Sequence, residues 1–304
     1  MTPRRLARAP GAADAAVAFC VGGASSLVAR SLLRSHPPGG VERWTRSNHA
    51  GCPVTLLEGP AYAVGAVSGA LWSGLGGPAA VAGLGAAALG VIDDFAGESS
   101  SKGLRGHLSA ASRGDLTTGM IKIVGLGVTG LAAAWMVDRS RPRTGTRVAE
   151  SSVTGALDTL VGGAVIAGSA NLVNLLDLRP GLALKVVLLA VPLVAGRRGN
   201  HVSTTTAAAT AGAAMAALPD DLAGQSMLGD TGANSAGALL GTALVARADL
   251  PGRLLALAAL TVLTLASEKV SFTKVIESSP VLSYLDALGR PSQPSLTAFP
   301  TSTP

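Results

Sequence analysis

Residues 77 to 94 read Gly77-Pro-Ala-Ala-Val-Ala-Gly-Leu-Gly-Ala-Ala-Ala-Leu-Gly-Val-Ile-Asp-Asp94, an apolar run that ends in two adjacent carboxylates. An ionised acid inside hydrocarbon costs roughly 3 kcal/mol or more, so a membrane span gains nothing from Asp93 and Asp94. Where the membrane meets water, the same pair can hold a divalent cation or move a proton. The stretch therefore predicts a membrane-spanning helix with a functional site at one end.

The composition of the whole chain favours an integral membrane protein. Of the 304 residues, 48% are hydrophobic and only 14% are charged, whereas about 25% of the residues of soluble domains are charged. The mean hydropathy is +0.44. The net charge of +6 is typical of the short basic loops between spans, so we do not expect nucleic acid as a partner.

Nine apolar segments predict an all-α fold, a polytopic membrane helix bundle with about nine transmembrane helices. A helix needs about 20 residues to cross the hydrocarbon, and several of these Ala/Gly-rich segments are shorter. The predicted spans are 11–33, 60–73, 78–92, 119–137, 153–170, 181–195, 202–218, 233–246 and 250–266. They form one transmembrane domain, residues 1–268, followed by a polar tail, residues 269–304, that we expect to be partly disordered.

The polar segments that follow the odd-numbered spans should all lie on one side of the membrane, because successive spans alternate in direction. These segments are 43–51, 93–94, 171–181, 220–232 and 268–274. Apart from Asp249, Asp138, Glu150 and the N-terminal Asp14, the acids outside the spans lie on this side, which predicts one site assembled from five segments. The basic residues are divided almost evenly between the two sides, so the positive-inside rule does not decide the orientation.

Simpler explanations exist for two of the acidic pairs. Asp93 and Asp94 could cap a helix, but acids stabilise helix N-termini and these two follow the C-terminal end of a span. Asp220 and Asp221 follow Pro219, which favours a solvated turn or the start of a helix over a catalytic role. We therefore expect the first pair, and not the second, to belong to the site.

Three motifs, in their order and spacing, resemble one family of membrane enzymes. They are Leu89-Gly-Val-Ile-Asp-Asp94, Asn171-Leu-Val-Asn-Leu-Leu-Asp177 and Gly229-Asp-Thr-Gly232. The family is that of the polyprenyl-phosphate N-acetylhexosamine-phosphate transferases. The resemblance implies a glycosyltransferase that moves a sugar phosphate from a UDP-sugar to a polyprenyl phosphate, releases UMP and uses Mg²⁺, in the synthesis of cell-envelope polymers such as peptidoglycan.

The resemblance also implies roles for individual residues. Asp230 would be the metal ligand, and Asp93 and Asp94 would orient or deprotonate the attacking lipid phosphate. Lys122 would neutralise phosphate as a point charge. These roles suit phosphoryl transfer, which depends on positioning and charge neutralisation, and they suit Mg²⁺, for which one or two carboxylates suffice beside substrate phosphates.

A substrate-binding segment is implied around the end of the fifth span. Asn171, Asn174 and Asp177 match family positions near the nucleotide and the metal. Where the family has a further acid, this chain reads Leu178-Arg179-Pro180. An arginine donates where an acid accepts, so we expect Arg179 to contact phosphate or the lipid carrier. A histidine-rich loop and a tenth span of the family are also missing from this sequence.

By resemblance, the chain is a multi-pass protein of the cell membrane with its site on the cytoplasmic face. Its partners would be a polyprenyl phosphate, a nucleotide sugar and membrane lipids; the sugar, the nucleotide and the oligomeric state, a homodimer included, are left open. An alternative is a non-catalytic descendant that binds or translocates a lipid-linked precursor, or scaffolds envelope enzymes. A transporter places polar groups near the midplane, whereas these acids stand at span ends, which favours the enzyme.

Overall fold

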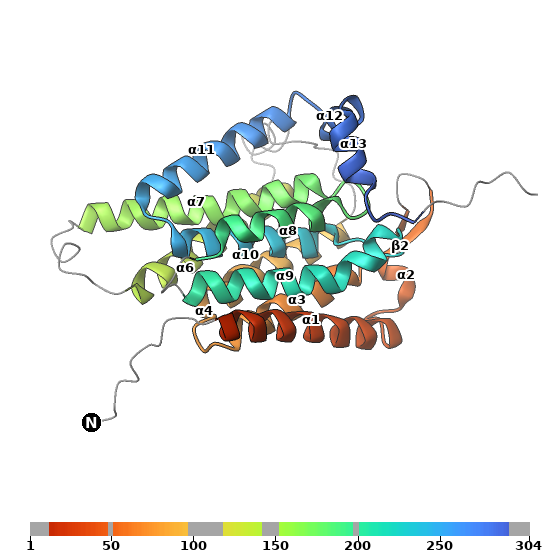
Figure 1. Ribbon diagram of the computed structural model, residues 1–304, viewed down its shortest axis with the longest axis horizontal. Helices are drawn as coiled ribbons and strands as arrows, with labels where there is room; N and C mark the ends of the chain where they lie inside the picture. Colours follow the sequence, from red (N-terminus) through yellow and green to blue (C-terminus); the bar gives the residue numbers. More distant parts are fainter. Residues whose placement is uncertain (1–11, 48–50, 97–117, 142–151, 197–200, 292–304) are drawn as a thin grey trace, which may run out of the picture.

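The computed structural model describes residues 12–47, 51–96, 118–141, 152–196 and 201–291, which form a bundle of helices (Figure 1). The helices and strands are α1 (Ala12–Ser35), α2 (Val41–Trp44), β1 (Thr45–Ser47), β2 (Pro53–Thr55), α3 (Glu58–Leu71), α4 (Gly77–Ala96), α6 (Thr118–Ser140), α7 (Ser152–Leu176), α8 (Leu182–Val194), α9 (His201–Leu222), α10 (Gly229–Arg247), α11 (Leu250–Ser267), α12 (Phe272–Ser278) and α13 (Pro280–Ala287). The predicted all-α class is therefore confirmed, with one small antiparallel hairpin added.

The predicted number of membrane spans is not confirmed. Each of the nine predicted segments coincides with one helix, but only five helices of the described ranges are long and apolar enough to cross a membrane. They are Ala12–Ser35, Gly77–Phe95, Gly119–Ser140, Val153–Leu176 and Leu250–Ser267. These five helices indicate a membrane-embedded protein.

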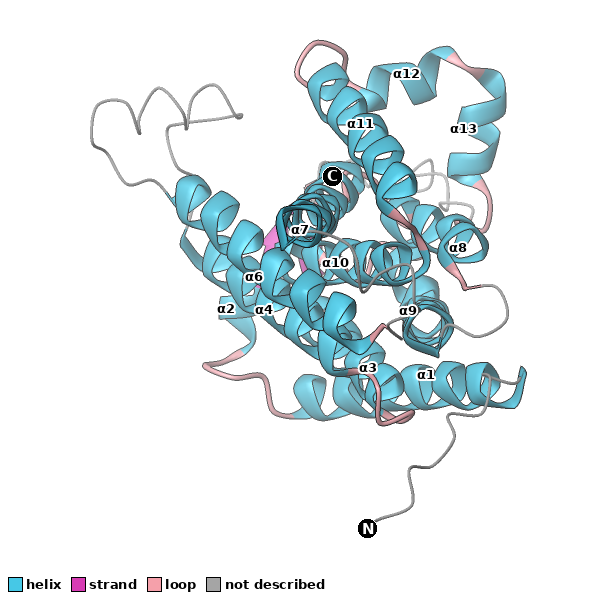
Figure 2. Cartoon of the chain, turned by 90° about the vertical axis from the view of Figure 1, so that its left-hand side faces the viewer, coloured by secondary structure: helices cyan, strands magenta, loops and turns pink. Residues whose placement is uncertain are grey.

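Helix α10 shows why apolar character is a poor guide to the interior of this bundle. It packs against α3, α4, α6, α7, α8 and α9, and Figure 2 shows it surrounded by other helices. Because it touches protein on nearly every side, its sequence is rich in Gly, Ala, Ser and Thr. Small residues let backbones approach closely: a Cβ at Gly241 would lie only 2.8 Å from the Cα atom of Ile166.

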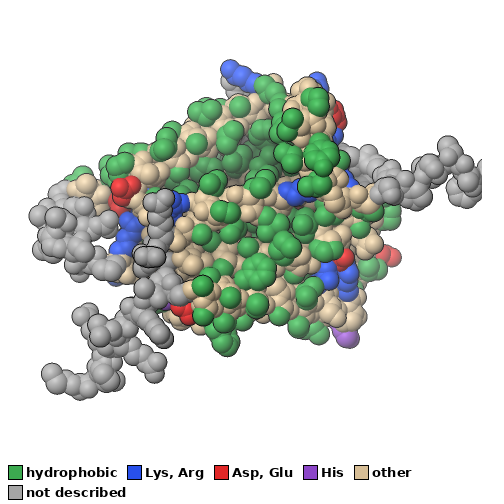
Figure 3. Space-filling view, viewed as in Figure 1, with side chains coloured by type: hydrophobic (Ala, Val, Ile, Leu, Met, Phe, Trp, Pro, Cys, Tyr) green, Lys and Arg blue, Asp and Glu red, His purple; other side chains and the backbone are tan. Residues whose placement is uncertain are grey.

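Large apolar side chains lie on the outside of the molecule. Leu255, Leu189 and Val128 are 74%, 72% and 64% exposed, and only 6% of the apolar stretch of α11 is buried. Figure 3 shows hydrophobic side chains over most of one face, with the charged side chains few and mostly toward its ends. Such a surface is suited to lipid and not to water, which agrees with a membrane-embedded bundle.

One end of the bundle carries the hairpin and the short helices α2, α12 and α13 (Figure 1). The amide of Thr55 donates to the carbonyl oxygen of Gln225 at 3.3 Å, and the amide of Met227 donates to that of Thr55 at 3.1 Å. These bonds attach the hairpin to the segment just before α10. The described part of the predicted tail contains the helices α12 and α13. Residues 292–304 lie outside the described part, so partial disorder of the tail stays a prediction.

Candidate active site

An ion-pair network between three helices forms the centre of the candidate site. Lys122, near the start of α6, donates from Nζ to Oδ2 of Asp93 at 2.9 Å and to Oδ2 of Asp230 at 2.6 Å. Asp93 lies in the last turn of α4, and Asp230 lies in the first turn of α10. All three side chains are largely buried. The structure thus brings together three residues that were predicted from distant parts of the sequence.

Gly90 allows α4 to approach α10 closely enough for this contact. A Cβ atom at position 90 would overlap the backbone of Asp230, so only glycine fits there. Asp93 and Asp94 follow within about one helical turn. The close approach therefore delivers both carboxylates to the N-terminal end of α10.

Asp94 caps the N-terminus of α10. Its Oδ1 accepts from the backbone N–H of Asp230 at 3.0 Å, and its Oδ2 accepts from the N–H and the hydroxyl of Thr231 at 3.0 and 2.6 Å. The first N–H groups of a helix have no partner within that helix, and the helix dipole favours negative charge there. No motif around Asp94 indicates this partner, because α10 is far away in the sequence.

Asp177, just after α7, reaches the same helix end. It accepts a hydrogen bond from the backbone N–H of Gly229, whose φ of +58° favours glycine. Its Oδ2 atom is shielded from solvent and has no hydrogen-bond partner in the described residues. Burial, followed by the negative charge of Asp221, raises the pKa of Asp177 well above its usual range. The raised pKa favours the protonated form, and the unpaired Oδ2 atom leaves this carboxyl group able to form a further hydrogen bond with a ligand.

Asp230 has a pKa close to neutral pH. It lies outside the five candidate spans. Burial, followed by a hydrogen bond with Asp93, raises its pKa to about 7, while Lys122 acts in the opposite direction. Near neutral pH this carboxyl group can therefore take up or release a proton, as groups in active sites often do.

Glu58 and Asp221 are two further buried acids near Asp177, and neither was predicted to belong to the site. Glu58 is 2% exposed and accepts a hydrogen bond from the hydroxyl of Ser226. Burial, and next the charge of Asp221, raises the pKa of Glu58 well above its usual value. A lone acid at the start of an apolar run gives no sequence signal that it will be buried, because its surroundings come from residues 221 and 226.

Asp220 and Asp221 lie in the last turn of α9 and not in the solvated turn or helix start that was expected, while the expectation that they are not catalytic stays a prediction. Asp220 forms ion pairs of 2.7 Å with Arg30 and Arg34. Asp221 is instead 2% exposed and accepts from the backbone N–H of Gly181. Burial raises its pKa to about 6. Adjacent residues on a helix point in different directions, so one acid meets arginines at the surface and the other faces the interior.

Basic and aromatic side chains from the segment after α1 pack against the C-terminal end of α4. Arg46 donates from Nη2 to the carbonyl oxygen of Asp94 at 2.6 Å. The guanidinium of Arg43 lies 4.7 Å from the centroid of the Phe95 ring, and the Trp44 ring packs edge-on against the same ring at 4.9 Å. Cations over aromatic faces and at helix C-termini are favourable. The segment after α1 is therefore joined directly to the acidic motif.

Arg179 forms ion pairs with two acids of its own chain. Its Nη1 atom donates to Oδ2 of Asp286 at 2.8 Å, and its Nη2 atom pairs with Glu277. Asp286 also accepts from Arg290 at 2.7 Å. These contacts join the loop after α7 to α12 and α13, a partnership that the sequence analysis did not anticipate. Contact of Arg179 with phosphate or the lipid carrier remains a prediction.

The two asparagines of the same motif stand free near the end of α7. Asn171 and Asn174 are partly exposed, and within the described residues their side-chain amides make no hydrogen bond. The backbone carbonyl of Asn174 accepts from the amide of Asp177 at 3.2 Å. Both side chains can therefore offer a donor and an acceptor to a ligand.

The carboxylates fit the requirements of Mg²⁺ in part. Among the described residues no group of three or more His, Cys, Asp or Glu side chains is arranged to hold a metal ion. Mg²⁺ commonly takes only one or two protein carboxylates and completes its coordination with water and substrate phosphates. Asp93 and Asp230 supply two carboxylates that already share one cation, the ammonium of Lys122.

Comparisons with known proteins add no family to these observations. The sequence matches no protein-family model and no curated protein. Any assignment of function therefore depends on the geometry of the site and on the resemblance of the three motifs.

Proposed function

We propose that the chain is a multi-pass membrane enzyme that transfers a sugar phosphate from a UDP-sugar to a polyprenyl phosphate, with release of UMP. Its site would lie on the cytoplasmic face of the cell membrane, and its product would serve the synthesis of a cell-envelope polymer. The observation that carries this proposal is the Lys122 bridge between Asp93 and Asp230 at the end of the bundle. A positive charge beside two carboxylates supports this proposal, because the transfer of a phosphate group needs both charge neutralisation and a site for Mg²⁺.

The reaction forms one phosphorus–oxygen bond and breaks another. An oxygen of the lipid phosphate bonds to the sugar-bearing phosphorus, the bond from that phosphorus to the bridging oxygen breaks, and UMP leaves with that oxygen. Asp93 would orient the lipid phosphate and accept its proton when it arrives protonated. Lys122 would neutralise charge on the phosphates, and Asp94 would act as a positioning residue through its cap on α10.

Asp230, with Asp93 beside it, would hold Mg²⁺, which supplies charge neutralisation to the diphosphate. Asn171, Asn174 and Asp177 would bind the nucleotide sugar, since their polar atoms have hydrogen-bonding capacity to spare. The residues that would serve each substrate thus come from different helices, which suits a reaction between two molecules that arrive from different phases.

The test is an assay of UMP release by the purified full-length chain in detergent. A panel of UDP-sugars is offered with a polyprenyl phosphate and Mg²⁺. Asp230→Asn keeps the shape of the side chain but loses the charge, so turnover should fall by about two orders of magnitude or more. Asp220→Asn, which alters an acid held by surface arginines, should keep turnover. Near-normal turnover in Asp230→Asn would refute its role as the metal ligand.

A second candidate function is favoured by one observation. Arg179, in the segment expected to meet the nucleotide, is already paired with Asp286 and Glu277. A chain that binds or scaffolds a lipid-linked precursor without catalysis could use the remaining polar groups in this way. Binding of polyprenyl phosphate without UMP release from any UDP-sugar in the panel would support this candidate over the enzyme.

A further inference from the structure

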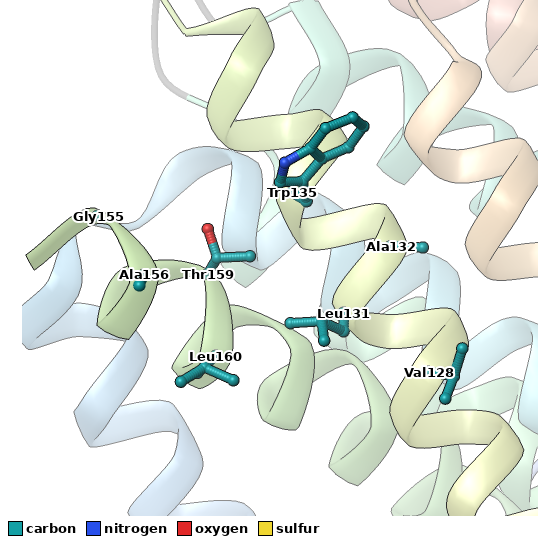
Figure 4. Close-up of a pocket in the computed structure, with 8 residues that line it drawn as sticks. All are labelled: Val128, Leu131, Ala132, Trp135, Gly155, Ala156, Thr159 and Leu160. Atoms are coloured by element: carbon teal, nitrogen blue, oxygen red, sulfur yellow. The ribbon is translucent and has the colours of Figure 1, made fainter. Parts of the chain in front are cut away.

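An apolar groove runs along the outside of the bundle between α6 and α7, in the half remote from Lys122. Its volume is about 660 Å³, which falls in the range of roughly 300–1,000 Å³ typical of ligand sites. Its walls are drawn in Figure 4 and are formed by Val128, Leu131, Ala132 and Trp135 of α6 and by Gly155, Ala156, Thr159 and Leu160 of α7. Trp135 lies 13 positions after Lys122, about 20 Å along the helix.

The lining of the groove offers few polar groups to a small polar ligand. The polar side-chain groups among the eight lining residues are the hydroxyl of Thr159, which donates to Oδ2 of Asp138 at 2.8 Å, and the indole N–H of Trp135. Both α6 and α7 are candidate membrane spans. The open side of the groove therefore faces hydrocarbon in a membrane, and an apolar chain is the occupant that this environment supplies.

The guanidinium of Arg139 stands at the outer end of the groove. Arg139 follows Trp135 by four residues, on the same stripe of α6, and its guanidinium lies 4.0 Å from the centroid of the indole ring. The neighbouring acid, Asp138, forms an ion pair with Arg253 at 2.6 Å and accepts a hydrogen bond from Thr159. No carboxylate of the described residues pairs with Arg139. Its charge is therefore available to an anion.

We infer that this groove is a binding site for an anionic phospholipid, with the phosphate at Arg139 and one acyl chain between α6 and α7. The stack of guanidinium on indole holds the cation at the level where an apolar chain would leave the groove. Trp and Arg at a span end are suited to the boundary between headgroups and hydrocarbon. The site is separate from the carboxylates at the other end of α6 and does not depend on the proposed transferase activity.

The test measures lipid retention by the full-length protein in detergent. Equal amounts of phosphatidylglycerol and phosphatidylcholine with the same acyl chains are added, and native mass spectrometry counts the lipids that stay bound. The wild type should retain phosphatidylglycerol in preference. Arg139→Gln should lower that preference about fivefold, because one basic residue near a membrane contributes about 1 kcal/mol. Lys269→Gln, a control at an exposed lysine after α11, should leave the preference unchanged.

A second pair of variants tests the groove itself. Gly155 lines the groove and Gly127 does not, yet neither has an atom within 4 Å of the position of an added Cβ. Leucine also forms helices better than glycine, so both Gly155→Leu and Gly127→Leu should fold and melt like the wild type. Gly155→Leu should lose the retained lipid, and Gly127→Leu should keep it.

Three results would overturn the inference. They are a wild type that retains no phosphatidylglycerol in preference, an unchanged preference in Arg139→Gln, and unchanged retention in Gly155→Leu. None of these measurements uses UMP release. A result that contradicts the lipid-binding site therefore says nothing about the proposed transferase activity, and the reverse also holds.

Discussion

Lys122 and Asp230 are joined by a hydrogen-bonded ion pair of 2.6 Å, although 108 positions separate them in the sequence. The same ammonium reaches Asp93, so one positive charge serves two carboxylates that would otherwise disfavour ionisation of each other. Partly buried ion pairs add little to stability on average. The arrangement is therefore better explained by a need for charge at this end of the bundle than by a need for stability.

Variants of Lys122 should distinguish its effect on UMP release from its effect on the stability of the fold. Lys122→Gln removes the cation that would meet phosphate, so UMP release should fall by about 100-fold or more. The variant also leaves Asp93 and Asp230 without their shared partner, which should lower the melting temperature. Lys122→Gln combined with Asp93→Asn should regain melting temperature but not turnover. Turnover of Lys122→Gln within threefold of the wild type would contradict a catalytic role.

Removing the cap on α10 should lower stability. Asp94→Ala deletes the acceptor for two backbone N–H groups, and the loss of such a cap typically costs about 1–2 kcal/mol. Asp94→Asn keeps one carbonyl oxygen, so its effect on the melting temperature should be smaller. Asp220→Ala, which breaks only partly exposed ion pairs, serves as the control. An Asp94→Ala protein that melts with the wild type would rule out the capping role.

The buried acid Asp221 should make stability depend on pH. Its folded pKa of about 6 lies above the unfolded value of about 3.9. The folded state therefore binds more protons in this interval, and the free energy of unfolding falls as the pH rises from about 4 to about 7. For Asp221 the fall is on the order of 2 kcal/mol.

The measurement is thermal unfolding in detergent with a chelator across this pH range. Asp221→Asn should show a shallower fall than the wild type, whereas Asp220→Asn should keep the wild-type slope. Equal slopes for the wild type and Asp221→Asn would show that Asp221 does not carry the shifted ionisation.

Cysteine labelling can test the sidedness of the bundle. Ser35 and Ser271 are exposed near the end that carries the candidate site, and Ser140 is exposed at the end of α6 that is remote from Lys122. In a chain whose native Cys20 and Cys52 are replaced by serine, single cysteines at 35 and 271 should be labelled from one side of the membrane. A cysteine at 140 should be labelled from the other. Labelling of 35 and 271 from opposite sides would contradict a site assembled from one face.

Sequence reasoning identified the helices well because their signals are local. Apolar runs interrupted by short polar segments predicted every long helix of the described chain, and the end of each run was within six residues of a helix end. The apolar runs also predicted nine membrane spans, whereas only five of the described helices are long and apolar enough to cross a membrane. Helix α10 is short of large apolar residues because it is packed inside protein, and this distinction depends on neighbours that the sequence of one segment does not reveal.

The candidate site was predicted in its parts but not in its contacts. Asp93, Lys122 and Asp230 were expected to cooperate, and the structure brings them together. The cap that Asp94 provides and the pairing of Arg179 with Asp286 were not expected. Both involve a second helix whose position follows from packing, so no motif around either residue could have indicated them.

The amino-acid sequence by itself determined that this chain is helical, that it is built from apolar segments and that its acids gather where apolar runs end. Hydropathy and helix formation depend on residues within a few turns of one another, so these properties can be read directly from the chain. Only the tertiary structure decided which acid meets which partner. Gly90 lets α4 touch α10, and this close approach, between residues far apart in sequence, places Asp94 at the start of α10. A third helix, α6, brings Lys122 to both Asp93 and Asp230.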